Sequence, residues 1–166
     1  IVLDPGSAFG TGYHWTTRLC LEFLEDLSEQ TVCSPMLDLG TGSGILAIAA
    51  HLLGIHDILA VDNDPVACKV ARENLDINQG QAVGVELRDT PPAGPFALIS
   101  ANLVAALLVD FAARLFASLK PGGHLICGGI IEGRRQEVVA ALESQGFQLL
   151  HEKTGDEWVS LLLVRP

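Results

Sequence analysis

Short apolar runs alternate with longer amphipathic segments along most of the chain. Runs of four or five aliphatic and β-branched residues predict buried strands, whereas apolar positions that recur every three or four residues predict helices. Strands are predicted at residues 35–39, 58–61, 83–87, 97–101, 124–127, 147–151 and 159–164. Helices are predicted at residues 16–28, 45–53, 65–80, 103–119 and 132–144.

The order of these elements predicts an α/β fold. Strands that alternate with helices form right-handed crossovers, which place the strands parallel in one sheet and cover both of its faces with helices. The last two strands are joined by a short polar turn at residues 154–157, so they run antiparallel to each other and one of them is reversed. We therefore expect a five-stranded Rossmann-like core, mostly parallel, with one reversed strand near the C-terminus.

Local signals mark several helix ends. Thr16 or Thr17 is a candidate N-cap for the first helix. Asp64 followed by Pro65 has the pattern of an N-cap and first helical residue. Gly54 is expected just beyond the end of the second helix, where a left-handed conformation is common.

Composition narrows the class of protein. The chain has 166 residues, the size of one domain, and 49% of them are hydrophobic, which predicts a sizeable core and excludes a disordered chain. The mean hydropathy of +0.37 agrees with this. With 10 basic and 20 acidic residues the formal net charge is −10, so we expect no direct nucleic-acid binding. Such a charge suits a neutral cofactor or a basic partner better.

Cysteine spacing and terminal patterns indicate the compartment. The four cysteines form no C-x-x-C pair, so a zinc site and a disulfide framework are not expected. Buried thiols in a reducing cytoplasm are the simplest interpretation. No run is long and apolar enough to span a membrane, and no signal peptide is expected. Because the chain begins with Ile1 and not with Met, we expect a fragment of a longer protein. Separately, we expect the protein to be a monomer.

A glycine-rich loop follows the first predicted strand. The stretch reads Asp38-Leu39-Gly40-Thr41-Gly42-Ser43-Gly44. Glycines at Gly40, Gly42 and Gly44 allow a sharp turn and let a ligand approach the backbone without a Cβ in the way. The next strand ends at Asp62, whose carboxylate can accept hydrogen bonds from the two ribose hydroxyls of an adenosine. These four residues are therefore candidate cofactor-binding residues.

The spacing of the glycines indicates which nucleotide binds. A dinucleotide fingerprint G-x-G-x-x-G would need glycine at position 45, where this chain has Ile45. No G-x-x-x-x-G-K-[ST] motif is present, so a nucleoside triphosphate is not expected. The pattern favours S-adenosylmethionine, and a nicotinamide-dependent dehydrogenase is the alternative from a different class.

Asn102 directly follows the fourth predicted strand, so it faces the same crevice as the glycine loop. Its side-chain carbonyl can accept a hydrogen bond from a substrate amine or from the cofactor. An N-cap for the helix at 103–119 is a second role for Asn102, and the two roles are compatible.

The first seventeen residues form a loop with the composition of a lid. Residues 3–17 contain three glycines, one proline and the aromatic residues Phe9, Tyr13 and Trp15. Aromatic anchors between glycine hinges are typical of a segment that closes over a site. We expect residues 1–17 to be this lid and residues 18–166 to be the catalytic domain.

These motifs resemble a family of ribosomal protein methyltransferases whose members methylate the eleventh protein of the large ribosomal subunit. The specific part of the resemblance is Phe9-Gly10-Thr11-Gly12-Tyr13-His14-Trp15-Thr16-Thr17. It continues through the glycine loop, Asp62-Asn63-Asp64-Pro65, Ala101-Asn102-Leu103, Lys120-Pro121-Gly122-Gly123, Gly128-Gly129-Ile130 and Glu157-Trp158. The family commonly has proline at the position of Trp15.

The resemblance implies a class I methyltransferase that binds S-adenosylmethionine. It implies cofactor contacts from Thr17, Gly40, Asp62 and Asn102, and Phe9, Gly10 and Thr11 of the lid are further candidates. It also implies methyl transfer to amino groups, lysine side chains or an N-terminal amine, of a ribosomal protein. The family has a small N-terminal domain that holds the substrate, and no segment of this sequence corresponds to it. Another protein or a small-molecule amine is the alternative substrate.

Methyl transfer to an amine needs the amine's lone pair. A lysine ammonium has none, so a water-poor pocket that lowers its pKa serves the reaction, together with accurate positioning. Asn102 is the candidate for positioning, and His14 is the candidate base, with a structural hydrogen bond in the lid as its rival role. No histidine pair has metal-ligand spacing, so no metal is expected.

Overall fold

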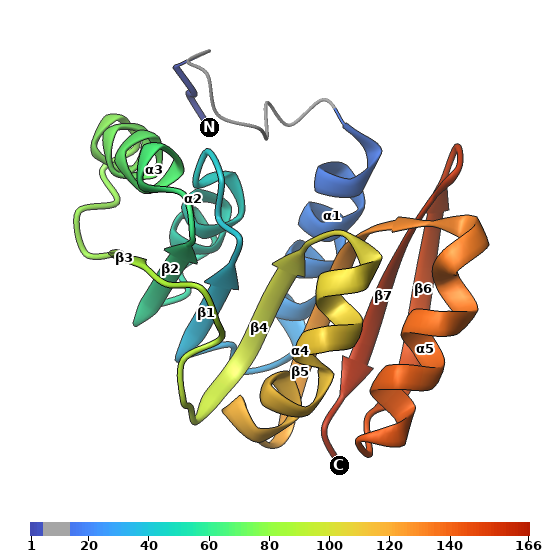
Figure 1. Cartoon of the computed structure of the whole chain (residues 1–166). Coiled ribbons are helices and arrows are strands. Elements are labelled where there is room, and N and C mark those ends of the chain that lie inside the picture. Colours follow the sequence, from blue (N-terminus) through green and yellow to red (C-terminus); the bar gives the residue numbers. More distant parts are fainter. Residues whose placement is uncertain (5–13) are drawn as a thin grey trace.

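The chain folds into one seven-stranded sheet with helices on both faces, as seen in a computed structural model that describes residues 1–4 and 14–166 (Figure 1). The strands are β1 (Met36–Leu39), β2 (Ile58–Asp62), β3 (Gly84–Leu87), β4 (Phe96–Asn102), β5 (Leu119–Ile131), β6 (Gln148–Gly155) and β7 (Trp158–Val164). The helices are α1 (Trp15–Gln30), α2 (Ile45–Leu52), α3 (Pro65–Ile77), α4 (Ala105–Ser118) and α5 (Arg135–Ser144), with a 3₁₀ turn at Glu132–Arg134.

The strand order is β3-β2-β1-β4-β5-β7-β6. The first five strands are parallel, and β7 pairs antiparallel with both β5 and β6. The fold class is therefore confirmed, with β7 as the reversed strand. The predicted five-stranded core corresponds to the parallel strands, and the two C-terminal strands extend it to seven.

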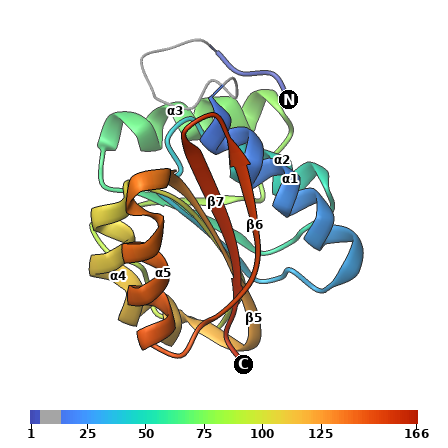
Figure 2. The same cartoon turned by 90° about the vertical axis from the view of Figure 1, so that its right-hand side faces the viewer.

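Two apolar cores lie on opposite faces of the sheet, one under α1 and α2 and the other under α4 and α5, which cover the two faces in Figure 2. Successive strand residues alternate between them, because side chains along a strand point to opposite faces. Leu98 belongs to the core under α1 and α2, whereas Ile99 belongs to the core under α4 and α5. Both side chains are fully buried, as parallel strands covered on both faces require.

Several helix ends differ from the sequence-based expectation. Asp64 caps α3 as predicted, since its carboxylate accepts the Val66 N–H at 2.8 Å. The N-cap of α1, however, is His14, and not Thr16 or Thr17, because the imidazole Nδ1 accepts the Thr16 N–H. The predicted cap at Asn102 is also wrong, since α4 begins later, with Val104 at its N-cap.

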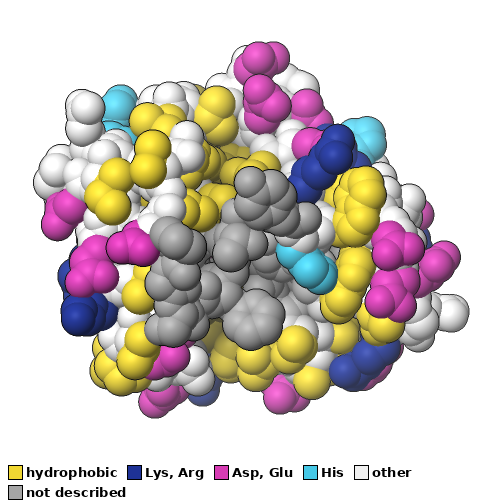
Figure 3. Space-filling model, turned by 90° about the horizontal axis from the view of Figure 1, so that it is seen from above, with side chains coloured by type: hydrophobic (Ala, Val, Ile, Leu, Met, Phe, Trp, Pro, Cys, Tyr) yellow, Lys and Arg dark blue, Asp and Glu magenta, His cyan; other side chains and the backbone are white. Residues whose placement is uncertain are grey.

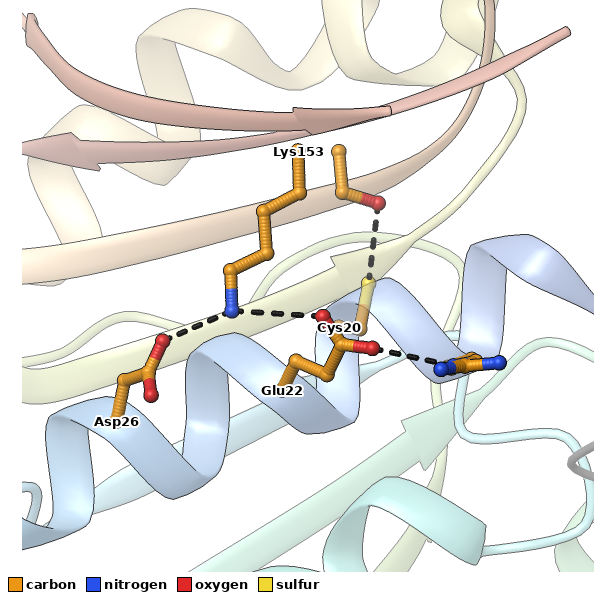
Figure 4. A network of polar contacts seen from close by, with 6 residues as sticks. Cys20, Glu22, Asp26 and Lys153 are labelled. Carbon is orange, nitrogen blue, oxygen red and sulfur yellow. Dashed lines mark hydrogen bonds and ion pairs between the residues drawn. The ribbon is translucent and has the colours of Figure 1, made fainter. Parts of the chain in front are cut away.

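Two strands are longer than their apolar runs suggested. β5 begins at Leu119, ahead of the strand predicted at 124–127, and residues 120–123 form an irregularity in its pairing with β4. β6 continues to Gly155 and pairs with β7 over its whole length. There Lys153 lies over the Phe23 ring of α1, with its Nζ 2.8 Å from Asp26 and 3.5 Å from Glu22 (Figure 4).

Candidate functional site

The carboxyl ends of β1, β2 and β4 meet at one edge of the sheet, the upper edge in Figure 1. Leu39 of β1 pairs with Val61 of β2 on one side and with Ala101 of β4 on the other. The residues that directly follow these three are Gly40 after β1, Asp62 at the end of β2 and Asn102 at the end of β4. The strand order reverses between β1 and β4, which is where open α/β sheets bind ligands.

The glycine loop turns from β1 into α2 through left-handed backbone conformations. Gly40, Gly42 and Gly44 have φ values of 72°, 55° and 83°, which residues with a Cβ rarely adopt. A Cβ on Gly40 would also overlap the Leu103 side chain. The loop needs glycine for its own path, because the Leu103 side chain occupies the space of a Cβ on Gly40 and Ala71 packs closely against Gly44.

Asp62 links the end of β2 to this loop. One carboxylate oxygen accepts the Gly42 N–H at 2.9 Å, and the other accepts the Asp64 N–H at 3.0 Å. Each oxygen has two lone pairs, so each retains one for a ligand hydroxyl. The two amides fix the orientation of the carboxylate before any ligand arrives.

Asp38 is a site residue to which the sequence analysis assigned no role. It is buried, and its two carboxylate oxygens accept the hydroxyls of Thr41 and Ser100, each at 2.6 Å. Burial raises the pKa of Asp38 above its usual range, and the hydrogen bonds from Ser100, Thr41 and Ala47 act in the opposite direction. Asp38 therefore ties the glycine loop to β4. The hydroxyl residue at position 100, inside an otherwise apolar strand, was the available signal.

Asn102, the last residue of β4, lies beside the first turn of α1 and the end of β5. Its amide nitrogen is 3.5 Å from the hydroxyl oxygens of both Thr16 and Thr17. Its amide oxygen faces Gly128 of β5, which pairs with it in register. The structure thus brings together Thr17 and Asn102, two residues for which the family resemblance implies cofactor contacts.

His14 stands at the start of α1 beside the β6–β7 hairpin. Its Nδ1 is 3.0 Å from the Thr16 hydroxyl, and its ring packs edge-on against Trp158 with 4.9 Å between the ring centroids. The neighbouring Trp15 ring lies against Gly155, where any Cβ would overlap it. His14 therefore has a capping role in this structure, and its role as a base stays a prediction.

The structure tests only some of the remaining predictions, which concern the lid residues, metal ligands and membrane-spanning helices. Phe9, Gly10 and Thr11, and with them most of the predicted lid, lie outside the described residues. Within residues 1–4 and 14–166, no group of three or more metal-ligating side chains is found. No helix in the same ranges is long and apolar enough to cross a membrane. Seen from above, hydrophobic side chains gather at the carboxyl edge, and charged side chains lie around its margin (Figure 3).

The sheet order, the reversed β7 and the glycine loop define the chain as a Rossmann-like methyltransferase fold. An RNA methyltransferase from Salinibacter ruber, solved with S-adenosyl-L-homocysteine, has this fold, with a TM-score of 0.69 at 18% identity over 88% of this chain and 90% of that one. The ribosomal protein L11 methylase from Lactobacillus delbrueckii subsp. bulgaricus is more similar, with a TM-score of 0.89 at 34% identity over 98% of this chain and 83% of that one.

The sequence comparisons give the family. The model of the ribosomal protein L11 methyltransferase (PrmA) family matches residues 1–166, so the chain belongs to this family. The relative from Chloroflexus aurantiacus is 46% identical, covering 100% of this chain and 58% of that protein. The relative from Symbiobacterium thermophilum is 42% identical, covering 100% and 54%. The chain thus spans between half and three-fifths of the length of these two relatives.

Gly128 tests the packing around Asn102. A Cβ there would lie 2.5 Å from Cys20 Sγ and 2.8 Å from Asn102 Oδ1, so Gly128→Ala forces both side chains to move. We expect a loss of about 1–3 kcal/mol in the free energy of unfolding, measured by urea titration. Gly133→Ala is the matched control, because a Cβ there meets nothing within 4 Å. Equal urea midpoints for the two variants would contradict the close packing.

Asp38 tests the electrostatics of the same edge. Because its pKa is raised above the ordinary value of 3.8, the folded state binds this proton more tightly than the unfolded state. The stabilisation is complete below pH 3.8 and is lost as the pH rises through the raised pKa. The unfolding free energy of wild type should therefore fall relative to Asp38→Asn by about 1.4 kcal/mol per pH unit in that window. Urea titrations at a series of pH values measure this difference, and a flat or rising difference would disprove it.

Proposed function

We propose that the protein transfers a methyl group from S-adenosylmethionine to amino groups of ribosomal protein L11, on lysine side chains or the N-terminal amine. The observation that carries this proposal is the Asp62 carboxylate, held by the Gly42 and Asp64 amides at the point where the strand order reverses. Membership of the L11 methyltransferase family supports the substrate. Because this chain spans 58% and 54% of the length of two such relatives, its activity and its substrate are stated as proposals.

The residues at the carboxyl edge suit S-adenosylmethionine. The free lone pairs of Asp62 match the two ribose hydroxyls, and the neighbouring Gly40 and Gly42 are partly exposed. Ile45, the first residue of α2, is buried in the core where a dinucleotide fingerprint has glycine. This favours S-adenosylmethionine over a nicotinamide cofactor.

Positioning and water exclusion are the parts of the reaction that this chain's residues perform. When bound, S-adenosylmethionine supplies an electrophilic methyl group. In this proposal Asn102, which follows β4 at the carboxyl edge, accepts a hydrogen bond from the incoming amine, and its nitrogen lies near the hydroxyls of Thr16 and Thr17. Apolar side chains at the edge disfavour a charged ammonium and so help to expose its lone pair.

We also propose that the protein works as a monomer in the cytoplasm without binding nucleic acid directly. The residues Asp62, Asn102 and Thr17 all come from one chain, so the cofactor site needs no second copy. A net charge of −10 opposes contact with phosphate backbones and favours encounter with a basic ribosomal protein.

Asp62→Ala tests the cofactor assignment. The loss of a charged hydrogen-bond acceptor should weaken S-adenosylmethionine binding by about 1.5–3 kcal/mol, measured by titration calorimetry. Asp76→Asn, an exposed change on α3, is the control and should bind as wild type does. NAD is titrated in parallel and should give no binding heat. Unchanged affinity in Asp62→Ala would refute the ribose contact.

The length of the chain tests the substrate assignment. If only the crevice holds the substrate lysine, the reaction loses the binding energy that contacts to other parts of the substrate would supply. The chain of residues 1–166 should therefore methylate purified L11 about a thousandfold more slowly than a version extended to the length of its relatives, which corresponds to about 4 kcal/mol. Both versions should bind S-adenosylmethionine equally. Equal turnover would mean that the crevice itself recognises the substrate.

A further inference from the structure

One face of α3 holds two segments that are far apart in sequence. Ala71, Asn74 and Asn78 are spaced by three and four residues, so they share that face. Ala71 packs against the end of the glycine loop, where a Cβ on Gly44 would lie 3.3 Å from Ala71 Cβ. Asn78 lies at the other end of the helix, beside the N-terminal segment formed by residues 1–4.

Asn74 joins the two segments directly. Its amide nitrogen donates to the Ser43 carbonyl in the glycine loop at 2.8 Å. Its amide oxygen accepts the Asp4 N–H at 2.9 Å. The side chain is fully buried, and only a side chain with both a donor and an acceptor can serve these two groups together.

Asn78 holds the N-terminal segment one helical turn further on. Its amide oxygen accepts the Val2 N–H at 2.9 Å, and its amide nitrogen donates to the Val2 carbonyl at 2.6 Å. The Asn78 side chain thus bonds both the N–H and the carbonyl of Val2, as a residue of a neighbouring β-strand would. Both views place the N-terminal segment at the α3 end of the carboxyl edge (Figures 1 and 2).

We propose that Asn74 is a positioning residue of the cofactor site, which couples docking of residues 1–4 on α3 to the conformation of the glycine loop. Docking of the segment orders the Asn74 amide, and the ordered amide holds Ser43 between the two glycines nearest α2. The effect on cofactor binding rests on the proposed function. Because coupling is reciprocal, cofactor binding then also strengthens docking of residues 1–4.

Three variants separate the parts of this device. Asn78→Ala removes both bonds to Val2, together with the bond from the Asn78 amide nitrogen to the Asn74 carbonyl, and keeps the bond between Asp4 and the Asn74 side chain. Asn74→Asp retains the acceptor for Asp4 and loses the donor to Ser43, so it loosens the loop with the segment still tethered. Glu73→Gln changes the neighbouring exposed residue of α3 and is the matched control.

Amide hydrogen exchange of the ligand-free protein is the first measurement. We expect Asn78→Ala to speed exchange at the Gly42 and Gly44 amides about two- to fivefold, although Asn78 makes no bond to the loop. Asn74→Asp should speed it about three- to tenfold. Glu73→Gln should match wild type. Loop exchange that stays at the wild-type rate in Asn78→Ala, while Val2 exchange rises, would overturn the coupling.

Binding of S-adenosylhomocysteine is the second measurement. In wild type the ligand should slow exchange at the Val2 and Asp4 amides. Asn78→Ala should weaken ligand binding by the factor by which the ligand slows this exchange. Equal affinity in wild type and Asn78→Ala would overturn the coupling to the cofactor. If wild type itself fails to bind, the proposed function fails, and the ligand-free exchange at Gly42 and Gly44 still decides the positioning role of Asn74.

Discussion

The site depends on the left-handed turn that follows β1. Gly40, Gly42 and Gly44 take conformations that a side chain would strain, and this path directs the Gly42 amide at the Asp62 carboxylate. The same turn places Thr41 so that its hydroxyl reaches Asp38 below the loop. Two carboxylates, one buried and one partly exposed, thus hold the loop from β1 and β2.

The layout of the sheet explains why the loop and its partners could be predicted. Buried parallel strands carry continuous apolar runs, so β1, β2 and β4 are visible in the sequence, and their carboxyl ends must share one edge. The positions of Gly40, Asp62 and Asn102 follow from this rule alone. The family resemblance added the substrate and the roles of residues near α1, because the pattern of hydrophobic residues carries no information on either.

The features that the sequence missed depend on partners distant in the chain. A threonine is the usual helix cap, yet His14 caps α1, because its ring is held in place by Trp158 across the molecule. Lys153 lies beyond the strand predicted at 147–151, yet β6 continues through it, paired with β7, and Glu22 and Asp26 of α1 form ion pairs with its ammonium. Asn74 reads as a surface residue of α3, and only the fold brings Ser43 and Asp4 to its amide.

The reversed strand β7 has a role at the same edge. A parallel strand would bring its last residue to the carboxyl edge, whereas antiparallel β7 brings its first residue, Trp158, and the tip of the hairpin with it. Gly155 and Trp158 then form the surface on which Trp15 and His14 start α1. Because α1 begins there, Thr16 and Thr17 face Asn102, so the orientation of β7 sets the geometry of the predicted amine site.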